Sequence, residues 1–534
     1  MNKTLSNFIY AIIIGLVFVN CANRGTPGGG PKDETPPSII KSEPENYTTH
    51  FKGNEIKVYF DEYIKIKDLS KQLIISPPMK TQPIVTPLGG ASKYITIKIS
   101  DTLLANTTYA FNFGNSITDN NEGNPYPYYR YVFSTGAYID SLSIKGNIVD
   151  ALKKEPETFV NVSLYEVDST FTDSIIYKEN PKYITNTLDS LTTFSIENLK
   201  PGKYLLTALK DGNGDNKFQQ KTDQIAFYKN FIEVPSDSSY TLKLFQEEID
   251  FKSTRPRLIS GEKIAFGFEG DYQDMNIEIL SETPADYEYR ITKDQETDSL
   301  NYWYKPRMEV DSLIFKVTKN DYEKEYTARI SEQQRDSLLI AVSPSGSIGY
   351  TEDFTITGNT PLSKFDASKV SMMDKDSVAV SFTTDFDSIK NAYALKFDKT
   401  EDNNYRINIL PEAFEDFFGD TNKDTLNYAL RTSKASDFGY ARFTLVNATY
   451  PLIIQLTDKQ GKVKAEQFVE KAGAIDFQNL TPSFYSIRII HDTNGNQKYD
   501  TGNYLKKIQP EKVSHFDEFE IRADWGEALT LTFK

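Results

Sequence analysis

The chain has 534 residues and a formal charge of −15, because 60 Lys and Arg stand against 75 Asp and Glu. This excess of acid disfavours sequence-independent binding to nucleic acid and to anionic membrane surfaces, since both depend on Lys and Arg. A single Cys excludes an internal disulfide and any Cys-rich metal site. The length predicts about three to five domains, and 33 Tyr and 34 Phe against 2 Trp and 6 Met favour β-strands.

The first residues have the pattern of a secretory signal peptide. Lys3 supplies a positive charge, and Phe8 to Val19 form an apolar run that is short for a bilayer span. The lone Cys21 follows directly after Asn20. This pattern resembles a bacterial lipoprotein signal, although Asn20 stands where Gly, Ala or Ser is usual. The resemblance implies that Cys21 becomes the mature N-terminus and carries acyl chains; the alternative is an ordinary signal peptide with an incidental Cys.

Strand patterns dominate the rest of the chain. Apolar and polar residues alternate in segments 56–60, 94–99, 313–317 and 529–533. A period of two is typical of half-buried antiparallel strands. Within the body only residues 411–418 have a helical pattern. The predicted fold class is therefore all-β, with antiparallel β-sandwiches in tandem.

An internal repeat relates two segments of the chain. Residues 198–204 (Asn-Leu-Lys-Pro-Gly-Lys-Tyr) align with 479–485 (Asn-Leu-Thr-Pro-Ser-Phe-Tyr) at an offset of 281 (479 − 198). The same offset relates Asp211 to Asp492, Asn213 to Asn494, Gly214 to Gly495 and Phe218 to Tyr499. The element resembles one in transthyretin-like sandwiches of the carboxypeptidase-regulatory type. Because Ser483 replaces Gly202, we expect the second turn to differ from the first.

Earlier motifs resemble another family. Phe60-Asp61-Glu62, Ile75-Ser76-Pro77-Pro78 and the segment 113–124 follow one another in the order found in the bacterial Ig-like domain of S-layer-associated proteins and Bacteroidetes lipoproteins. Residues 409–422 resemble the same pattern less closely. The resulting division is a signal peptide (1–20), a lipidated tether (21–34), an Ig-like domain (35–137), a transthyretin-like sandwich (138–248), an unassigned β-rich domain (249–345), a second Ig-like domain (346–436) and a second transthyretin-like sandwich (437–534).

Motifs for catalysis are not visible in the sequence. His50, His491 and His515 lie far apart and have no recognisable nucleophile or acid partner. No glycine-rich phosphate-binding loop follows a strand, and 75 acidic residues make accidental carboxylate pairs too common to indicate a glycosidase. We therefore predict that the protein is not an enzyme.

Two repeated acidic loops are the best candidates for a ligand. Their oxygen-bearing residues occupy alternate positions in each copy of the repeat, which suits the six to eight oxygens that Ca²⁺ prefers. The candidate ligands are Asp211, Asn213, Asp215 and Asp223 in the first copy and Asp492, Asn494, Asn496 and Asp500 in the second. The alternative is a hairpin held by Asx turns. Calcium is the one cofactor that we predict.

A short motif recurs before aliphatic strands. Asp followed by Ser or Thr and then Leu occurs at Asp101, Asp140, Asp189, Asp311, Asp336 and Asp424. It is similar to the O-glycosylation acceptor of Bacteroidetes, and it is equally typical of turns that precede strands.

These features together predict an outer-membrane lipoprotein that faces the periplasm or the cell surface and acts as a non-catalytic binding or scaffolding module. Its expected partners are the membrane, through the lipid, and a protein of the envelope. One alternative is a glycan-binding or glycan-degrading component of an uptake system. Another is an accessory subunit of an outer-membrane β-barrel assembly or transport complex.

Overall fold

The computed structural model describes residues 33–188 and 192–533. The predicted signal peptide, Cys21 and the Asp189 motif lie outside the described residues. The described chain is nearly all β, which confirms the predicted fold class. Its helices are single turns: α2 (Leu69–Gln72), α3 (Ile175–Lys178) and the 3₁₀ turns η1 (Ala367–Lys369) and η2 (Ala435–Asp437).

The helix predicted over residues 411–418 was wrong. This segment contains β33 (Phe414–Asp416), which pairs with β28 (Leu362–Phe365). Glu412 has a positive φ of 60°, which a right-handed helix does not allow. Phe414 and Asp416 are both buried and Glu415 between them is less so, which is the alternation of a strand.

Five clusters of buried apolar side chains divide the strands into five modules, numbered here in chain order. Module 1 contains β1–β8 (39–134), module 2 β9–β16 (142–244), module 3 β17–β24 (252–329), module 4 β25–β34 (340–431) and module 5 β35–β41 (439–532). Each cluster takes side chains from two facing sheets, as in a β-sandwich.

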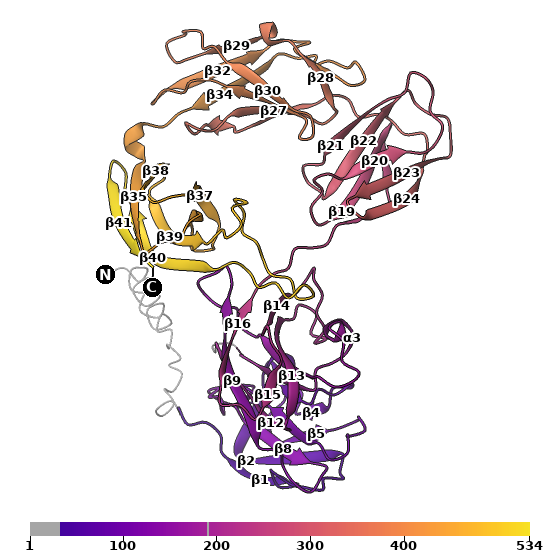
Figure 1. Ribbon diagram of the computed structural model, residues 1–534, viewed down its shortest axis with the longest axis vertical. Helices are drawn as coiled ribbons and strands as arrows, with labels where there is room; N and C mark the ends of the chain where they lie inside the picture. Colours follow the sequence, from indigo (N-terminus) through magenta and orange to yellow (C-terminus); the bar gives the residue numbers. More distant parts are fainter. Residues whose placement is uncertain (1–32, 189–191, 534) are drawn as a thin grey trace, which may run out of the picture.

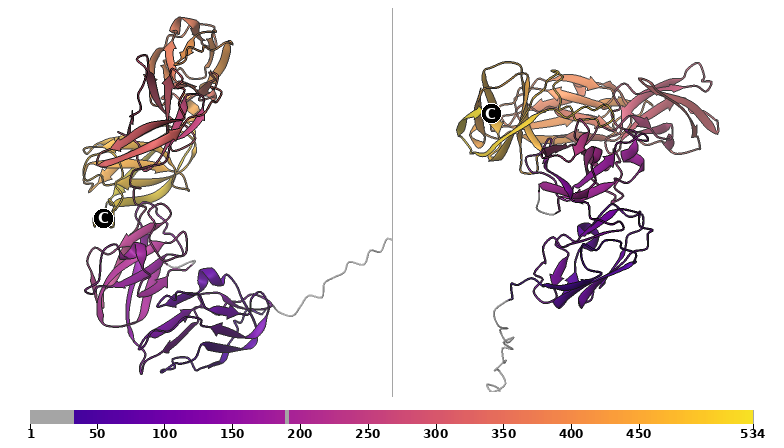
Figure 2. Two further views of the ribbon diagram at one scale, coloured as in Figure 1. Left: turned by 90° about the vertical axis from the view of Figure 1, so that its right-hand side faces the viewer. Right: turned by 60° about the horizontal axis from the view of Figure 1, so that its bottom comes forward.

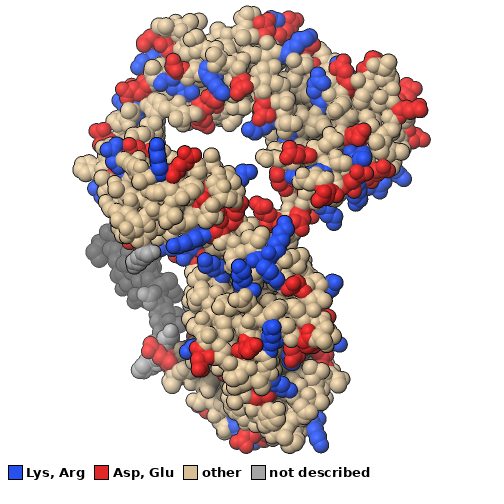
Figure 3. All heavy atoms as spheres, viewed as in Figure 1, with Lys and Arg blue, Asp and Glu red and all other residues tan. Residues whose placement is uncertain are grey.

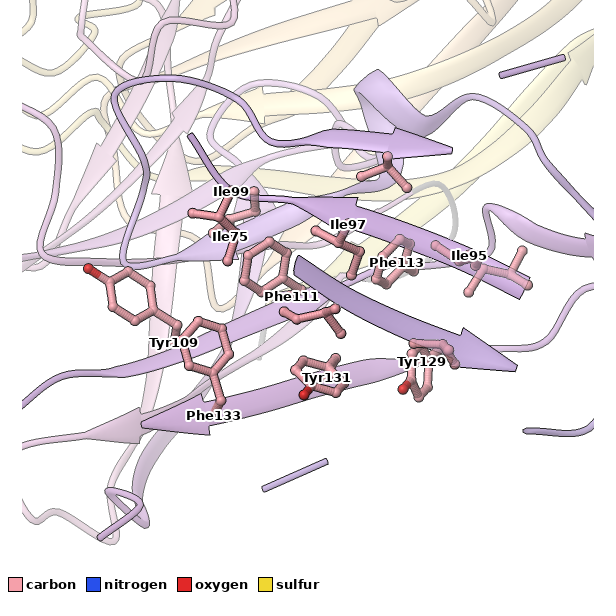
Figure 4. Close-up of a cluster of buried hydrophobic side chains, with 14 of the residues drawn as sticks. Ile75, Ile95, Ile97, Ile99, Tyr109, Phe111, Phe113, Tyr129, Tyr131 and Phe133 are labelled. Atoms are coloured by element: carbon pink, nitrogen blue, oxygen red, sulfur yellow. The ribbon is translucent and has the colours of Figure 1, made fainter. Parts of the chain in front are cut away.

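Module 1 packs one sheet with order β1-β2-β5-β4, joined by β7, against the sheet β3-β6-β8. Figure 4 shows its aromatic core, in which Phe111 and Phe133 from one sheet meet Ile95 and Ile97 from the other. Its strands are β1 (Ile39–Glu43), β2 (Glu55–Ile66), β3 (Ile74–Ser76), β4 (Ile84–Thr86), β5 (Ser92–Lys98), β6 (Thr108–Asn112), β7 (Ile117–Asp119) and β8 (Arg130–Ser134).

Modules 2 and 5 have the same topology. In module 2 the sheets are β12-β9-β16 and β11-β10-β13-β14, with β15 also on β13; in module 5 they are β38-β35-β41 and β37-β36-β39-β40. The first and last strands of each module pair in parallel, in an otherwise antiparallel sandwich. The strands of module 2 are β9 (Leu142–Asp150), β10 (Asn161–Glu166), β11 (Tyr183–Asn186), β12 (Thr193–Leu199), β13 (Gly202–Lys210), β14 (Gln224–Phe227), β15 (Ile232–Val234) and β16 (Ser239–Leu244). Those of module 5 are β35 (Gly439–Val446), β36 (Leu452–Thr457), β37 (Val463–Val469), β38 (Ala474–Leu480), β39 (Ser483–Ile490), β40 (Val513–Ile521) and β41 (Gly526–Thr532).

The two copies of the repeat have matching turns. Tyr204 donates its hydroxyl to the Lys200 carbonyl (3.0 Å), and Tyr485 donates to the Thr481 carbonyl (2.8 Å). The strands begin at the equivalent residues Gly202 and Ser483. Gly202 has no positive φ, so serine fits in its place. The expectation that the second turn differs was therefore wrong.

Modules 3 and 4 complete the chain. Module 3 contains the sheets β17-β19-β22-β21, with β18 on β19, and β20-β23-β24; module 4 contains β25-β27-β31-β30, β26-β34-β32-β29 and β28-β33. The strands of module 3 are β17 (Lys252–Ser253), β18 (Arg257–Ser260), β19 (Lys263–Glu269), β20 (Asn276–Ile279), β21 (Glu288–Lys293), β22 (Ser299–Lys305), β23 (Ser312–Lys319) and β24 (Tyr322–Arg329). The remaining strands of module 4 are β25 (Ile340–Ser343), β26 (Gly346–Ser347), β27 (Phe354–Gly358), β29 (Val370–Met373), β30 (Thr383–Asp387), β31 (Ala392–Lys396), β32 (Asn404–Ile409) and β34 (Leu426–Arg431).

The modules are arranged as a stem and a ring. Module 1 lies at the lower end, and modules 2 to 5 follow a closed path on which module 5, in yellow, returns to module 2, in magenta (Figures 1 and 2). Contacts join each successive pair: Lys221 with Glu269, Lys305 with the Phe417 carbonyl, Tyr350 with Phe438, and Tyr504 with Phe227. The chain therefore brings together segments that are more than 250 residues apart in sequence.

Candidate functional site

The histidines do not form a catalytic site. His50 lies in module 1, whereas His491 and His515 lie in module 5. His491 Nε2 is 3.0 Å from Ser514 Oγ, but no carboxylate of the described residues completes a triad. Burial lowers the pKa of His491 and of His515. Among the described residues, no group of three or more His, Cys, Asp or Glu could hold a metal ion.

In the first acidic loop the carboxylates accept backbone hydrogen bonds. Asp211 accepts from the N–H groups of Asn213 and Gly214 with one oxygen and from Asn216 with the other, at 2.6 to 3.0 Å. Asp223 is fully buried and accepts from the N–H groups of Gly212 and Gln219. Asp215 accepts from Lys217 N–H and from the Gln219 amide.

The second loop repeats this arrangement. Asp492 is fully buried and accepts from the N–H groups of Gly495, Asn496 and Gln497. The side-chain amides of Asn494 and Asn496 both donate to Asp500. Gly214 and Gly495 have nearly the same positive φ, 73° and 72°, where glycine is favoured.

In both loops most of the candidate oxygens accept hydrogen bonds from N–H donors of the same loop. This arrangement fits Asx turns. The calcium prediction therefore depends on a rearrangement of these side chains and stays a prediction.

The residues that the fold brings together lie elsewhere, at the junction of modules 2 and 5. Tyr504 of module 5 is fully buried in a cluster of apolar side chains from module 2, here called the Tyr504 socket. The socket includes Tyr165, Leu205, Phe218, Ile225, Phe227 and Phe245. The Tyr504 ring meets the Phe227 ring edge-on at 5.5 Å, and Lys507 Nζ lies 3.9 Å from the Tyr504 ring centroid.

The socket exists because one sheet of module 2 is apolar on both faces. In β13, Tyr204, Leu206 and Ala208 point into the sandwich core, whereas Leu205 and Leu209 point to the opposite face. The chain covers this second face with α3 and with the acidic loop that carries Phe218. Tyr504 packs against this second face beside α3 and the loop.

Sequence reasoning missed this junction, although a signal was present. Thr207 pairs with Phe227 in module 2, and the equivalent Arg488 pairs with His515 in module 5. The offset thus grows from 281 to 288 (515 − 227), so the second copy contains seven extra residues. Tyr504 lies within this longer loop.

A cavity of about 400 Å³ lies beside the socket. Its lining includes Asp150, Lys153, Lys154 and Lys243 from module 2 and Lys512 and His515 from module 5. Figure 3 shows Lys and Arg side chains gathered over this junction and an opening enclosed by modules 2 to 5.

A second exposed feature is an aromatic pair on module 1. Tyr59 of β2 lies opposite Tyr94 of β5, with ring centroids 5.8 Å apart. Lys41 Nζ lies 4.9 Å from the Tyr59 ring centroid, and the Tyr59 hydroxyl donates to Glu43. The pair lies on the outer face of the sheet and combines rings with polar groups.

Comparison with known proteins gives one family match. Residues 33–135 match the family model of the bacterial Ig-like domain, where the sequence motifs place an Ig-like domain. No curated protein matches the chain.

Solved structures share low identity with the chain. The surface layer protein SbsC, domains 1–6, is 11% identical over 88% of this chain and 67% of that chain, with a TM-score of 0.16. An I-band fragment of titin is 11% identical over 53% of this chain and 99% of its own, with a TM-score of 0.12. Salmonella alpha-2-macroglobulin is 8% identical over 91% of this chain and 42% of its own, with a TM-score of 0.15. At such TM-scores we draw nothing from these proteins about function.

The described residues contain no helix of sufficient length and apolar character to span a membrane.

Proposed function

We propose that this chain is a non-catalytic scaffolding or binding protein of the bacterial cell envelope, held at a membrane by acyl chains on Cys21. The observation that carries the proposal is the ring of modules 2 to 5, which positions sandwich surfaces relative to one another. The match of residues 33–135 to the bacterial Ig-like domain supports a bacterial, β-sandwich origin. The division into a lipidated tether and five domains (35–137, 138–248, 249–345, 346–436 and 437–534) remains part of this proposal.

The anchor follows from the lone Cys after an apolar run. Acyl chains contribute about 0.8 kcal/mol per buried methylene, so more than one chain gives stable attachment. The tether 21–34, rich in Gly and Pro, would then link the lipid to module 1. We propose the outer membrane as the site of attachment and an envelope protein as the partner.

Cell fractionation tests the anchor. Cys21→Ala should move the protein from the membrane fraction to the soluble fraction and abolish labelling by a clickable fatty acid. Unchanged fractionation together with absent labelling of the wild type would refute it. Crosslinking in intact cells, followed by mass spectrometry, identifies the partner; its matched control is Tyr504→Ala, which alters the ring and leaves the anchor intact.

A glycan ligand is a second candidate, favoured by the exposed Tyr94 and its half-buried neighbour Tyr59. Tyrosine rings flanked by Lys41 and Glu43 offer an apolar surface for a sugar ring and polar groups for its hydroxyls. If module 1 binds glycan, a glycan array should give signals that the double variant Tyr59→Ala/Tyr94→Ala loses. Absence of any signal for the wild type would exclude this candidate.

A further inference from the structure

The loop that carries Tyr504 contains backbone hydrogen bonds of its own. Asn503 and Ile508 exchange two backbone hydrogen bonds of 2.9 Å, and Lys507 N–H donates to the Tyr504 carbonyl. Lys507 takes a positive φ of 54°, which closes the turn. Residues 501–509, here called the clasp, therefore present Tyr504 from a short hairpin that is held by its own backbone hydrogen bonds.

The clasp also makes polar contacts across the junction. Thr501 donates to the Gln246 carbonyl (2.6 Å), and Gln509 donates to the Phe227 carbonyl (3.0 Å). Lys507 pairs with Asp173 at 2.7 Å. Gly502 lies against Phe245 so closely that a Cβ would be 2.5 Å from the ring. The contact is thus specific in shape and in hydrogen bonding.

The same contact buries groups that remain poorly paired. Glu247 is 4% exposed and accepts from the Tyr504 N–H and the Gln220 amide, with no cation within ion-pair distance among the described residues. Three of the seven buried side-chain atoms that lack a hydrogen-bond partner in the described chain are Asp150 Oδ2, Tyr499 OH and Tyr504 OH. Burying such groups opposes closure.

We propose that the clasp is releasable: Tyr504 leaves and re-enters the socket, so that modules 2 to 5 exchange between a closed ring and an open chain. The favourable part of closure is the Tyr504 ring in its apolar socket, and the opposing part is the burial of Glu247 and the unpaired hydroxyls. The occupant of the socket is the clasp of the same chain. This inference goes beyond the proposed scaffold function and does not depend on the anchor.

Protonation of Glu247 gives closure a dependence on pH. Burial raises the pKa of Glu247, Asp250 raises it further, and its hydrogen bonds and Lys506 act in the opposite direction. Burial likewise raises the pKa of Asp150, which faces Lys153 and Glu157 and lies in the field of Arg488 and Tyr499. A raised pKa in the closed state means that these carboxyl groups favour closure below that pKa and weaken it as pH rises through it. His515 acts in the opposite sense, because burial, Arg488 and Lys154 lower its pKa.

Spin labels can report closure without touching the clasp. Lys154 and Asp517 lie 3.6 Å apart across the junction and are exposed, so replacing them costs little stability. The full chain with Cys21→Ser, Lys154→Cys and Asp517→Cys carries no other Cys. Dipolar broadening between the two labels then measures the closed fraction.

Tyr504→Ala should lower the closed-to-open ratio about 100-fold and remove the broadening. Tyr504→Phe is the matched control, because it keeps the ring, removes the unpaired hydroxyl and should close at least as well as the parent. Gly502→Val, which clashes with Phe245, should open the ring by a second route. Circular dichroism of each variant should keep the parent β spectrum; broadening that persists in both opening variants overturns the proposal.

Glu247→Gln isolates the carboxylate from His515. It should raise the closed-to-open ratio more at about pH 8 than at about pH 5, because the penalty for burying the charged carboxylate falls as pH falls. An equal effect at both pH values would contradict the role given to Glu247. Broadening in a mixture of chains that each carry one label would show exchange between copies and would overturn the assignment of the socket to the clasp of the same chain.

Discussion

Glu262 of module 3 lies in a buried ion-pair cluster, and its replacement measures how much this cluster stabilises the module. Its side chain is 1% exposed, and its two oxygens accept hydrogen bonds from Arg307 Nε (2.7 Å) and Arg335 Nε (2.8 Å). Arg335 also stacks on Phe418 of module 4, with its guanidinium carbon 3.9 Å from the ring centroid. Glu262 therefore fixes the segment after β24 to module 3 and, through Arg335, to module 4.

Replacing Glu262 by Ala removes two charge-assisted hydrogen bonds, each of which contributes about 1.5–3 kcal/mol. The side chains of Arg307 and Arg335 are 43% and 37% exposed, so water can solvate their charged ends once the carboxylate is gone. We therefore expect a loss below the simple sum of about 3–6 kcal/mol, namely about 2–3 kcal/mol, and about half of that for Glu262→Gln. With a urea dependence of about 1–1.5 kcal/mol per molar, the midpoint should fall by about 2 M.

Tryptophan fluorescence reports this loss locally. Trp303 is 1% exposed in module 3, whereas Trp525 is 58% exposed, so the change on unfolding comes mainly from module 3. The matched control is Glu288→Ala, which breaks an exposed pair with Lys305 at 3.5 Å and should change stability by less than about 0.5 kcal/mol. Equal midpoints for the two variants would refute the energetic role of the cluster.

The pH dependence provides a second check on Glu262. Burial raises its pKa, but the hydrogen bonds from Arg335 and Arg307 outweigh burial and hold the pKa below its ordinary value. A lowered pKa in the folded state means that the stabilisation is present above the unfolded value of about 4.3 and is lost as pH falls through the folded value. The difference between wild type and Glu262→Gln should therefore shrink only below about pH 4.

Three further predictions concern the repeat and module 1. Tyr204→Phe and Tyr485→Phe each lose one hydroxyl-to-carbonyl bond and should each cost about 1 kcal/mol in urea unfolding; a loss in one copy alone would contradict their equivalence. If the acidic loops bind calcium, titration calorimetry should detect heat and chelator should lower the melting temperature, with Asp211→Ala and Asp492→Ala each removing part of the shift; if chelator changes nothing while both variants still destabilise, the loops are turns. The excised segment 35–137 should give a β-type circular dichroism spectrum, and a helical or unfolded spectrum would show that it depends on its neighbours.

The sequence predicts local structure well where a pattern has one physical cause. Alternation in 56–60 and 313–317 becomes β2 and β23, because one face of each strand is buried. The segments related by the offset of 281 lie in two modules of the same topology, since equivalent turns need equivalent residues. The helix predicted over 411–418 was wrong because a short apolar run does not distinguish a helix from a strand.

The candidate site was harder to predict because it depends on contacts between modules. The run Tyr204 to Leu209 is apolar except for Thr207, which indicates a strand buried on both faces. That pattern predicts that something covers the second face, but the covering residue, Tyr504, comes from a loop nearly 300 residues away. The sequence pointed to the acidic loops instead, because oxygen-bearing residues at alternate positions are typical both of turns and of cation sites.

The parallel pairing of first and last strands sets how modules 2 and 5 respond to force. β9 pairs with β16 from Lys145 opposite Ser239 to Asp150 opposite Leu244, and β35 pairs with β41 in the same sense. Pulling the start of the first strand away from the end of the last slides the two strands along each other, so all ladder hydrogen bonds share the load at once. An antiparallel pair pulled from one end would open one bond at a time. Modules with this strand pairing therefore resist stretching in shear.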